Sequence, residues 1–316
     1  MISVIMSVYN EKSIYVEKSI DSILNQTYND LEMVIVLDSP DNEKLLRILK
    51  EYTHKDARVK LLINDRNIGL AMSLNRAIEV AQGEYLARMD ADDISKTERL
   101  ERELEYLIKN GLDVVSCVAD KIDENGNVWG EIKPFNNRPE VIKDLLEIQN
   151  VIIHPTVLMR TDIIKSVGGY RNFPSCQDYD LWLRLVTNNN KIGIINENLF
   201  QFRKHRESVT ATRRYNQILN EKYIRAMYHQ RLKNGKDSYS EDGLQRFLNE
   251  NGYSDSYKRQ LENEMLKQYG NGINLLKKHD VRGLWLVIRS LSSYSVRTSI
   301  GVSISGRVVK FKHRGK

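Results

Sequence analysis

The chain has 316 residues, of which 41% are hydrophobic and 28% charged, a globular composition that excludes an intrinsically disordered protein. It has no run of 18 apolar residues, no signal-peptide features at its start, and two cysteines that form neither a disulfide framework nor a metal-binding spacing. The net charge of +6 arises in residues 281–316, which hold eight Lys and Arg and no acid; without them 40 basic residues face 42 acidic ones, a net −2. We expect a cytosolic protein with one large core and an appendage, or with two domains.

The first half of the chain alternates between strand-like and helix-like segments. Apolar and β-branched runs predict strands at residues 2–8, 31–37, 59–63, 84–89 and 112–118. Helical spacing predicts helices at residues 13–26, 43–52 and 70–81, and after a capping-box pattern at 95–98. This alternation favours an α/β domain with a Rossmann-like, mainly parallel sheet flanked by helices.

The last third is helical in pattern. Helices are predicted at residues 213–232, 241–250 and 256–269, with no convincing strand after residue 213. The predicted division is therefore an α/β domain at 1–212 and a helical C-terminal region at 213–316.

Polar side chains follow four predicted strands where each strand ends. They are Tyr9, Asn10 and Glu11, then Asp38, residues 64–67 and residues 90–93. Parallel α/β sheets bind ligands at the carboxyl ends of their strands. We therefore expect a binding site at this edge.

Asp90, Asp92 and Asp93 place three carboxylates within four positions. Their charges repel, so a cation or hydrogen-bond donors must balance them. Carboxylate oxygens suit Mg²⁺ or Mn²⁺, which complete their coordination with substrate phosphate oxygens. Acidic triplets also occur on solvated loops. The position of this one after an apolar strand, beside three other polar strand ends, favours a metal site.

Five motifs occur in a fixed order along the first two-thirds of the chain. They are Ser-Val-Tyr-Asn at 7–10, Asp38, Asn-Ile-Gly-Leu-Ala at 67–71, Ala-Gln-Gly-Glu-Tyr-Leu-Ala-Arg-Met-Asp-Ala-Asp-Asp at 81–93, and Cys-Gln-Asp-Tyr-Asp-Leu-Trp-Leu-Arg at 176–184. In order and spacing they resemble the family 2 glycosyltransferases, and within them the bacterial exopolysaccharide enzymes of the amylovoran type. The resemblance implies a GT-A fold and an inverting glycosyltransferase that takes a nucleotide sugar and a divalent metal ion, Mn²⁺ or Mg²⁺.

The resemblance also implies roles for individual residues. Those implied to bind the nucleotide sugar are Val8, Tyr9, Asn10, Glu11, Asp38, Asn67, Asp90, Ala91 and Asp92. Asp90 would contact the nucleoside side, Asp92 would ligate the metal, and Asp38 would accept a hydrogen bond from the base. The family's Asp-Asp-Gly-Ser pattern reads Leu-Asp-Ser-Pro at 37–40 here, so the nucleotide stays open, with UDP as the default.

Asp178 matches the family's catalytic base. An inverting transfer needs a carboxylate that takes the proton of the acceptor hydroxyl, and such a base contributes roughly 10²–10⁴-fold. Gln177 replaces the family's neighbouring Glu, which leaves Asp180 as the alternative base. The alternative is a purely structural role, in which Asp178 only caps the helix that follows it.

The segment 202–208 resembles a late family motif with a histidine that joins the metal or the diphosphate. Here that residue is His205, and neutral imidazole is a suitable Mn²⁺ ligand. Its basic neighbours Arg203, Lys204 and Arg206 are predicted to screen the charge of the leaving diphosphate.

A helix beginning at residue 281 is predicted to carry one apolar face with arginines at its edge. The apolar residues are Val281, Leu284, Trp285, Ile288 and Leu291. An in-plane membrane helix is one interpretation of residues 281–316. A helix packed on the main domain, followed by a disordered basic end, is the other.

The resemblance implies a saccharide or lipid-linked acceptor in bacterial exopolysaccharide, capsule or O-antigen synthesis. A cytoplasmic location, with peripheral contact to the inner face of the cell membrane, follows from it, and no nucleic-acid partner is expected. A nucleotidyltransferase that makes nucleotide sugars is a rival, but the loop after the first strand lacks the glycine-rich, basic phosphate loop that it needs. A non-catalytic sugar-binding module is the other rival, but it would not need both the acidic triplet at 90–93 and the second acidic site after Cys176.

Overall fold

The computed structural model describes residues 1–134, 136–204 and 214–313. The chain divides into two compact units. One comprises residues 1–143, 151–172 and 180–205, and the other residues 144–150, 173–179 and 206–316. The domain boundary expected between residues 212 and 213 lies outside the described residues and stays a prediction.

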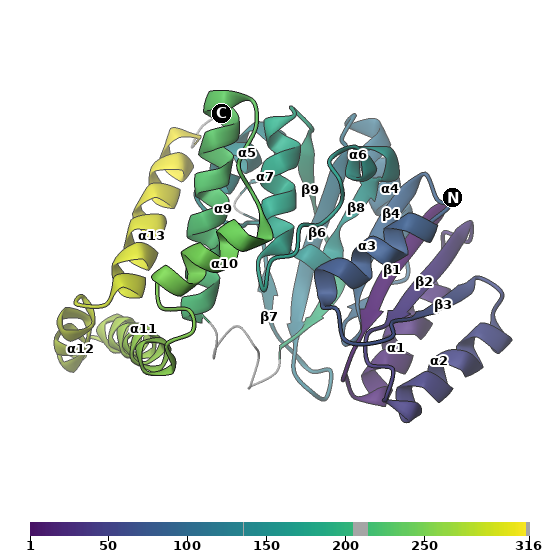
Figure 1. Ribbon diagram of the computed structural model, residues 1–316, viewed down its shortest axis with the longest axis horizontal. Helices are drawn as coiled ribbons and strands as arrows, with labels where there is room; N and C mark the ends of the chain where they lie inside the picture. Colours follow the sequence, from purple (N-terminus) through teal and green to yellow (C-terminus); the bar gives the residue numbers. More distant parts are fainter. Residues whose placement is uncertain (135, 205–213, 314–316) are drawn as a thin grey trace. The chain divides into compact units, whose positions relative to one another are not determined.

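Four parallel strands form the N-terminal half of the sheet in the first unit (Figure 1). They lie in the order β3 (Val59–Ile63), β2 (Leu31–Leu37), β1 (Ile2–Val8) and β4 (Tyr85–Asp90). β1 and β2 are almost wholly buried, as parallel strands with helices on both faces require, whereas β3 at the edge of the sheet is only partly buried. The strands predicted at these four places are confirmed, with β4 shifted by one residue.

The rest of the sheet is mixed. From β4 the order continues through β8 (Leu158–Arg160), β6 (Val114–Ile122), β9 (Ile192–Arg203) and β5 (Ile94–Ser95), and β7 (Val128–Ile132) pairs with β6. Short β8 runs antiparallel to both β4 and β6, so β4 and β6 point the same way, and β9 is parallel to β6. The carboxyl ends of β1, β2, β3, β4, β6 and β9 therefore lie along one edge.

Helices cover both faces of this sheet. In chain order they are α1 (Ser13–Leu24), α2 (Glu43–Lys55), α3 (Leu70–Val80), α4 (Arg99–Lys109), α5 (Pro139–Leu146), the short 3₁₀ helix η1 (His154–Thr156), α6 (Thr161–Ser166) and α7 (Gln177–Thr187). Apolar residues of α1, α2 and α4 join one core with alternate residues of β1 and β2, while α3 contacts the other face of these strands.

The N-terminus of α4 differs from its prediction. Ser95 belongs to β5, and the residue before the helix, Glu98, makes no side-chain capping bond. The cap comes instead from Gln26, whose Oε1 accepts from the backbone N–H of Leu100 at 3.0 Å. The capping-box prediction was wrong because Ser95 is drawn into strand pairing and a residue beyond the end of α1 caps the helix.

The second unit is helical in its described residues. Its long elements are α9 (Arg214–Asn234), α10 (Glu241–Glu250), α11 (Ser256–Lys277), α12 (Arg282–Ser290) and α13 (Tyr294–Lys312). Ser240 and Asp255 cap α10 and α11 by accepting backbone N–H groups, which fixes both starts where they were predicted. Among the helices of residues 1–134, 136–204 and 214–313, none combines the length and apolarity that a bilayer crossing requires.

Candidate active site

Strand pairing brings the predicted site residues of the first unit to one edge. Val8 pairs with Leu37, and Ser7 with Asp90, so the loops that begin at Tyr9, Asp38 and Ala91 leave neighbouring strands. The residues of these loops differ in burial. Val8, Asp38 and Ala91 are buried, Glu11, Asp90 and Asp92 are half-buried, and Tyr9, Asn10 and Asn67 are exposed.

The acidic loop after β4 gathers the three carboxylates. One oxygen each of Asp90, Asp92 and Asp93 lies within 4.8 Å of the others. Asp93 is 1% exposed, and its Oδ2 is buried without a hydrogen-bond partner. A buried, unpaired carboxylate oxygen is costly unless a cation balances it. This donor set of hard oxygens therefore fits Mn²⁺ or Mg²⁺.

Glu11 is a fourth carboxylate that interacts electrostatically with Asp90 and Asp92. Burial raises its pKa, and the charges of Asp92 and Asp90 raise it further, while the backbone N–H of Tyr9 donates to Oε2 at 2.7 Å and opposes the rise. The pKa of Asp93 also lies well above its ordinary value, first because of burial and then because of the same two aspartates. The site concentrates negative charge that a bound cation would relieve.

Two buried arginines contact the acidic loop and fix its position. Arg88, within β4, is 1% exposed and forms an ion pair with Asp90. Sequence reasoning missed it, although a charged residue within an otherwise apolar strand was a signal. Arg203 is the second.

Arg203 lies at the end of β9 and is 4% exposed. Its Nε donates to the carbonyl of Asp92 at 2.7 Å, and its backbone N–H donates to Asp93 Oδ1 at 2.7 Å. The guanidinium also donates to the carbonyl of Asp123 at 2.7 Å and lies 4.3 Å from the centre of the Tyr15 ring. The contacts of Arg203 fasten the loop that carries Asp92, and its screening of a diphosphate stays a prediction.

Asp38 holds a neighbouring loop. Its Oδ1 accepts from Asn64 Nδ2 at 2.6 Å and from the N–H of Ile68 at 2.8 Å, and its Oδ2 accepts from the N–H of Gly69 at 2.9 Å. Gly69 has a φ of +84°, a conformation that favours glycine. The carboxylate thus positions the loop that follows Asn67, and its contact with a base stays a prediction.

Asp178 belongs to the second compact unit and lies in the first turn of α7. It is half-buried, and Asn150 Nδ2 donates to its Oδ2 at 2.6 Å. Cys176, just before the helix, has a φ of +64°, and such strain at a non-glycine residue clusters at functional sites. The alternative base, Asp180, is fully buried.

Two arginines flank Asp180. Arg184 Nε lies 2.8 Å from its Oδ2, and Arg171 lies 3.5 Å from its Oδ1. A carboxylate that is fully buried and held in ion pairs by two guanidinium groups has no exposed oxygen for an acceptor to reach, so this environment disfavours Asp180 as the base. His205, the predicted histidine ligand, lies outside the described residues.

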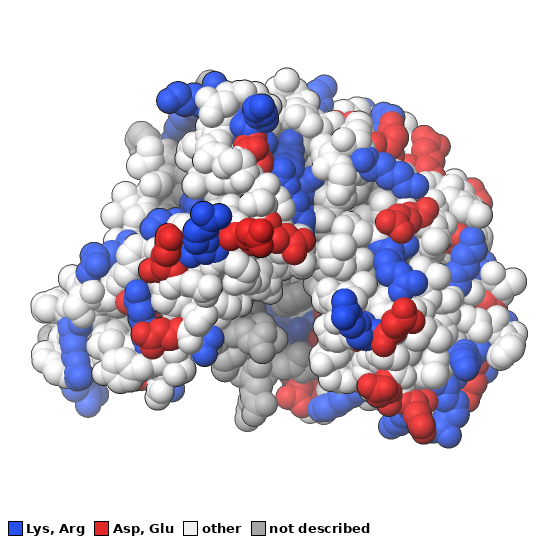
Figure 2. Space-filling view, viewed as in Figure 1, with Lys and Arg blue, Asp and Glu red and all other residues white. Residues whose placement is uncertain are grey.

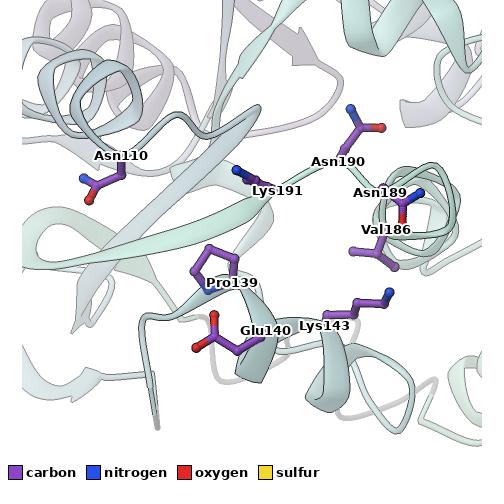
Figure 3. A pocket seen from close by; sticks show the side chains of 8 residues that line it. All are labelled: Asn110, Pro139, Glu140, Lys143, Val186, Asn189, Asn190 and Lys191. Atoms are coloured by element: carbon purple, nitrogen blue, oxygen red, sulfur yellow. The ribbon is translucent and has the colours of Figure 1, made fainter. Parts of the chain in front are cut away.

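A pocket of about 390 Å³ lies at the opposite edge of the sheet, between the ends of α4 and α7 and the start of α5 (Figure 3). Lys191, just before β9, lines it together with Glu140 and Lys143. Because β9 carries Arg203 at its other end, this pocket is separate from the acidic loop.

Comparison with solved structures identifies the fold class. The chain matches the crystal structure of S. aureus TarS 1–349 in complex with UDP, with a TM-score of 0.59 at 20% identity, over 99% of this chain and 91% of that one. The fold is therefore the GT-A fold of glycosyltransferases.

Sequence comparison then identifies the family. The model of glycosyl transferase family 2 matches residues 3–168, and the chain belongs to this family. It is 39% identical to the O-antigen biosynthesis glycosyltransferase WbnJ of Escherichia coli over 66% of this chain and 81% of that protein. It is 30% identical to the amylovoran biosynthesis glycosyltransferase AmsE of Erwinia amylovora over 70% and 83% respectively. The resemblance inferred from the motifs is confirmed.

Proposed function

We propose that this protein transfers a sugar, with inversion, from a nucleotide sugar to a saccharide or lipid-linked acceptor in bacterial exopolysaccharide, capsule or O-antigen synthesis. The observation that carries the proposal is the gathering of three carboxylates at the carboxyl edge of a GT-A sheet. UDP is the proposed nucleotide, supported by the UDP complex of the similar TarS fold. The polysaccharide products are supported by the names of WbnJ and AmsE.

The acidic loop would hold the divalent metal through Asp92, with Asp90 toward the nucleoside. A bound Mn²⁺ or Mg²⁺ supplies positive charge that stabilises a diphosphate leaving group. Arg203 and Arg88 would fix the loop so that the carboxylates face the cation without rearrangement. His205 is proposed as a further ligand.

Asp178 would take the proton of the acceptor hydroxyl as that oxygen attacks the anomeric carbon. Attack from the face opposite the departing diphosphate inverts the configuration of that carbon. Asn150 donates to one carboxylate oxygen of Asp178 and so helps to fix the orientation of this side chain. We therefore assign Asp178 the role of general base in this proposal.

A panel of nucleotide sugars tests the donor and the metal. We expect turnover of a UDP-sugar that requires Mn²⁺ or Mg²⁺ and stops with chelator. Turnover that is equal with chelator, or none with any nucleotide sugar and acceptor, would contradict the proposal. Formation of a nucleotide sugar from a sugar phosphate and a nucleoside triphosphate would favour the nucleotidyltransferase instead.

Arg203→Lys should raise the metal concentration needed for half-maximal activity by about tenfold. Lysine keeps the charge, but its single ammonium cannot reproduce the planar fork that reaches Asp92 and Asp123. Metal titration of activity measures the effect, and excess metal should rescue most of kcat. Arg102→Lys, which changes an exposed arginine paired with Glu197, serves as the control. Equal metal dependence of Arg203→Lys and wild type would reject a positioning role.

The proposed location is the cytoplasm, with peripheral contact to the inner face of the cell membrane. The support for such contact is the exposed face of α12.

A further inference from the structure

The helix α12 presents an apolar face to solvent. Its apolar residues are 39–81% exposed: Val281, Leu284, Trp285, Ile288 and Leu291. They recur at the spacing of one helical side. Among the described residues, no element packs against them closely enough to bury them.

The opposite side of α12 is the one that packs within the second unit. Gly283 and Ser290 are buried there, and α12 lies against α11. A Cβ on Gly272 of α11 would approach the carbonyl oxygen of Gly283 to 2.8 Å, so the two backbones already touch closely. The intramolecular packing of α12 is therefore complete without its apolar face. The sequence left open whether that face packs on the protein; in the described residues it does not.

The charged side chains within α12 and α13 are all basic. Arg289 stacks over Trp285, with its guanidinium carbon 5.1 Å from the ring centre. Arg297 and Arg307 are exposed on α13, and no acidic residue occurs from 281 to 313. Figure 2 shows basic side chains at the left end of the view, where α12 lies, and acidic side chains beside them over α11. Asp280, directly before the helix, is paired with Arg282, and Glu262 of α11 accepts from Ser293 and from the backbone N–H of Ser295.

We propose that the apolar face of α12 docks into the surface of an anionic phospholipid bilayer. The helix would lie in the plane of the headgroups, with Trp285 and Ile288 inserted and Arg289 beside the lipid phosphates. Exposed apolar residues with a tryptophan and flanking arginines are the composition of interfacial helices. Pairing with a second copy of the chain would bring like charges together, which disfavours self-association. This inference does not depend on the transfer chemistry.

Sedimentation of the full-length chain with vesicles tests the docking. Wild-type protein should pellet with phosphatidylcholine vesicles that contain phosphatidylglycerol and much less with phosphatidylcholine alone. Trp285→Ser combined with Ile288→Ser should weaken binding roughly tenfold or more, because both side chains lose their insertion. Arg289→Glu should weaken binding to the anionic vesicles only.

A matched control lies on β7. Val128 and Trp129 are 55% and 54% exposed, so Val128→Ser with Trp129→Ser removes a similar apolar area elsewhere and should leave vesicle binding unchanged. Because both pairs are exposed, neither double variant should unfold, and thermal unfolding checks this. Transfer to a water-soluble acceptor should be equal in wild type and the α12 variant.

Three results would overturn the docking proposal. One is equal pelleting of wild type and the α12 variant. Another is equal wild-type binding to neutral and anionic vesicles. The third is a dimer in sedimentation velocity that the α12 variant abolishes, since a second copy would then cover the face. If the wild-type protein bound vesicles but transferred no sugar, that result would count against the proposed function and not against the docking.

Discussion

Asp92→Asn should abolish metal-dependent nucleotide binding and lower kcat/KM by about 10²-fold or more, the scale of losing a preorganised electrostatic group. Asparagine keeps the size of the side chain but removes the negative charge that would bind the cation. Isothermal titration with UDP, in the presence and absence of Mn²⁺, measures the binding part. Steady-state transfer measures the catalytic part.

Asp30→Asn is the matched control for this variant. Asp30 is exposed and precedes β2, at the opposite edge of the sheet from the acidic loop. It should retain wild-type affinity for metal and nucleotide. If Asp92→Asn kept the same Mn²⁺ dependence as wild type, the proposed role of this carboxylate would be wrong.

Asp178→Asn should reduce sugar transfer by about 10²–10⁴-fold while nucleotide binding is retained. The amide can still occupy the place beside Asn150, but it cannot accept the acceptor's proton. Transfer kinetics and UDP affinity, measured on the same preparation, separate the two effects.

Asp180→Asn provides the contrast. Asp180 is buried against Arg184, so its substitution leaves a buried guanidinium without its counter-charge and should lower the unfolding temperature. Asp178→Asn, which is half-buried, should not. Full transfer activity in Asp178→Asn would remove this residue as the base.

The parallel half of the sheet could be predicted because its strands are encoded locally. β1 and β2 form from nearly continuous apolar runs that end at polar residues, and this pattern places Asp38 at a strand end without any knowledge of tertiary contacts. The same reasoning brought Asp90 and Asp92 to the edge where the structure gathers them. The starts of α10 and α11 were predictable for a similar reason, since their caps lie one residue before the helix.

Features that depend on distant residues could not be predicted. β8 has three residues and β5 has two, which is too short for any periodicity to appear. The loop contacts of Arg203 join residues more than a hundred positions apart, and the cap on Leu100 comes from Gln26. Ile108 follows the buried Leu107 in α4 but is itself 61% exposed, because burial depends on which residues the neighbouring strands supply.

Anomalous scattering at the manganese edge, from crystals grown with UDP and Mn²⁺, tests the central claim most directly. We expect a peak within bonding distance of Asp92, with the UDP diphosphate on the far side of the ion. A peak at another place, with UDP bound away from the carboxyl ends of β1 and β4, would contradict it.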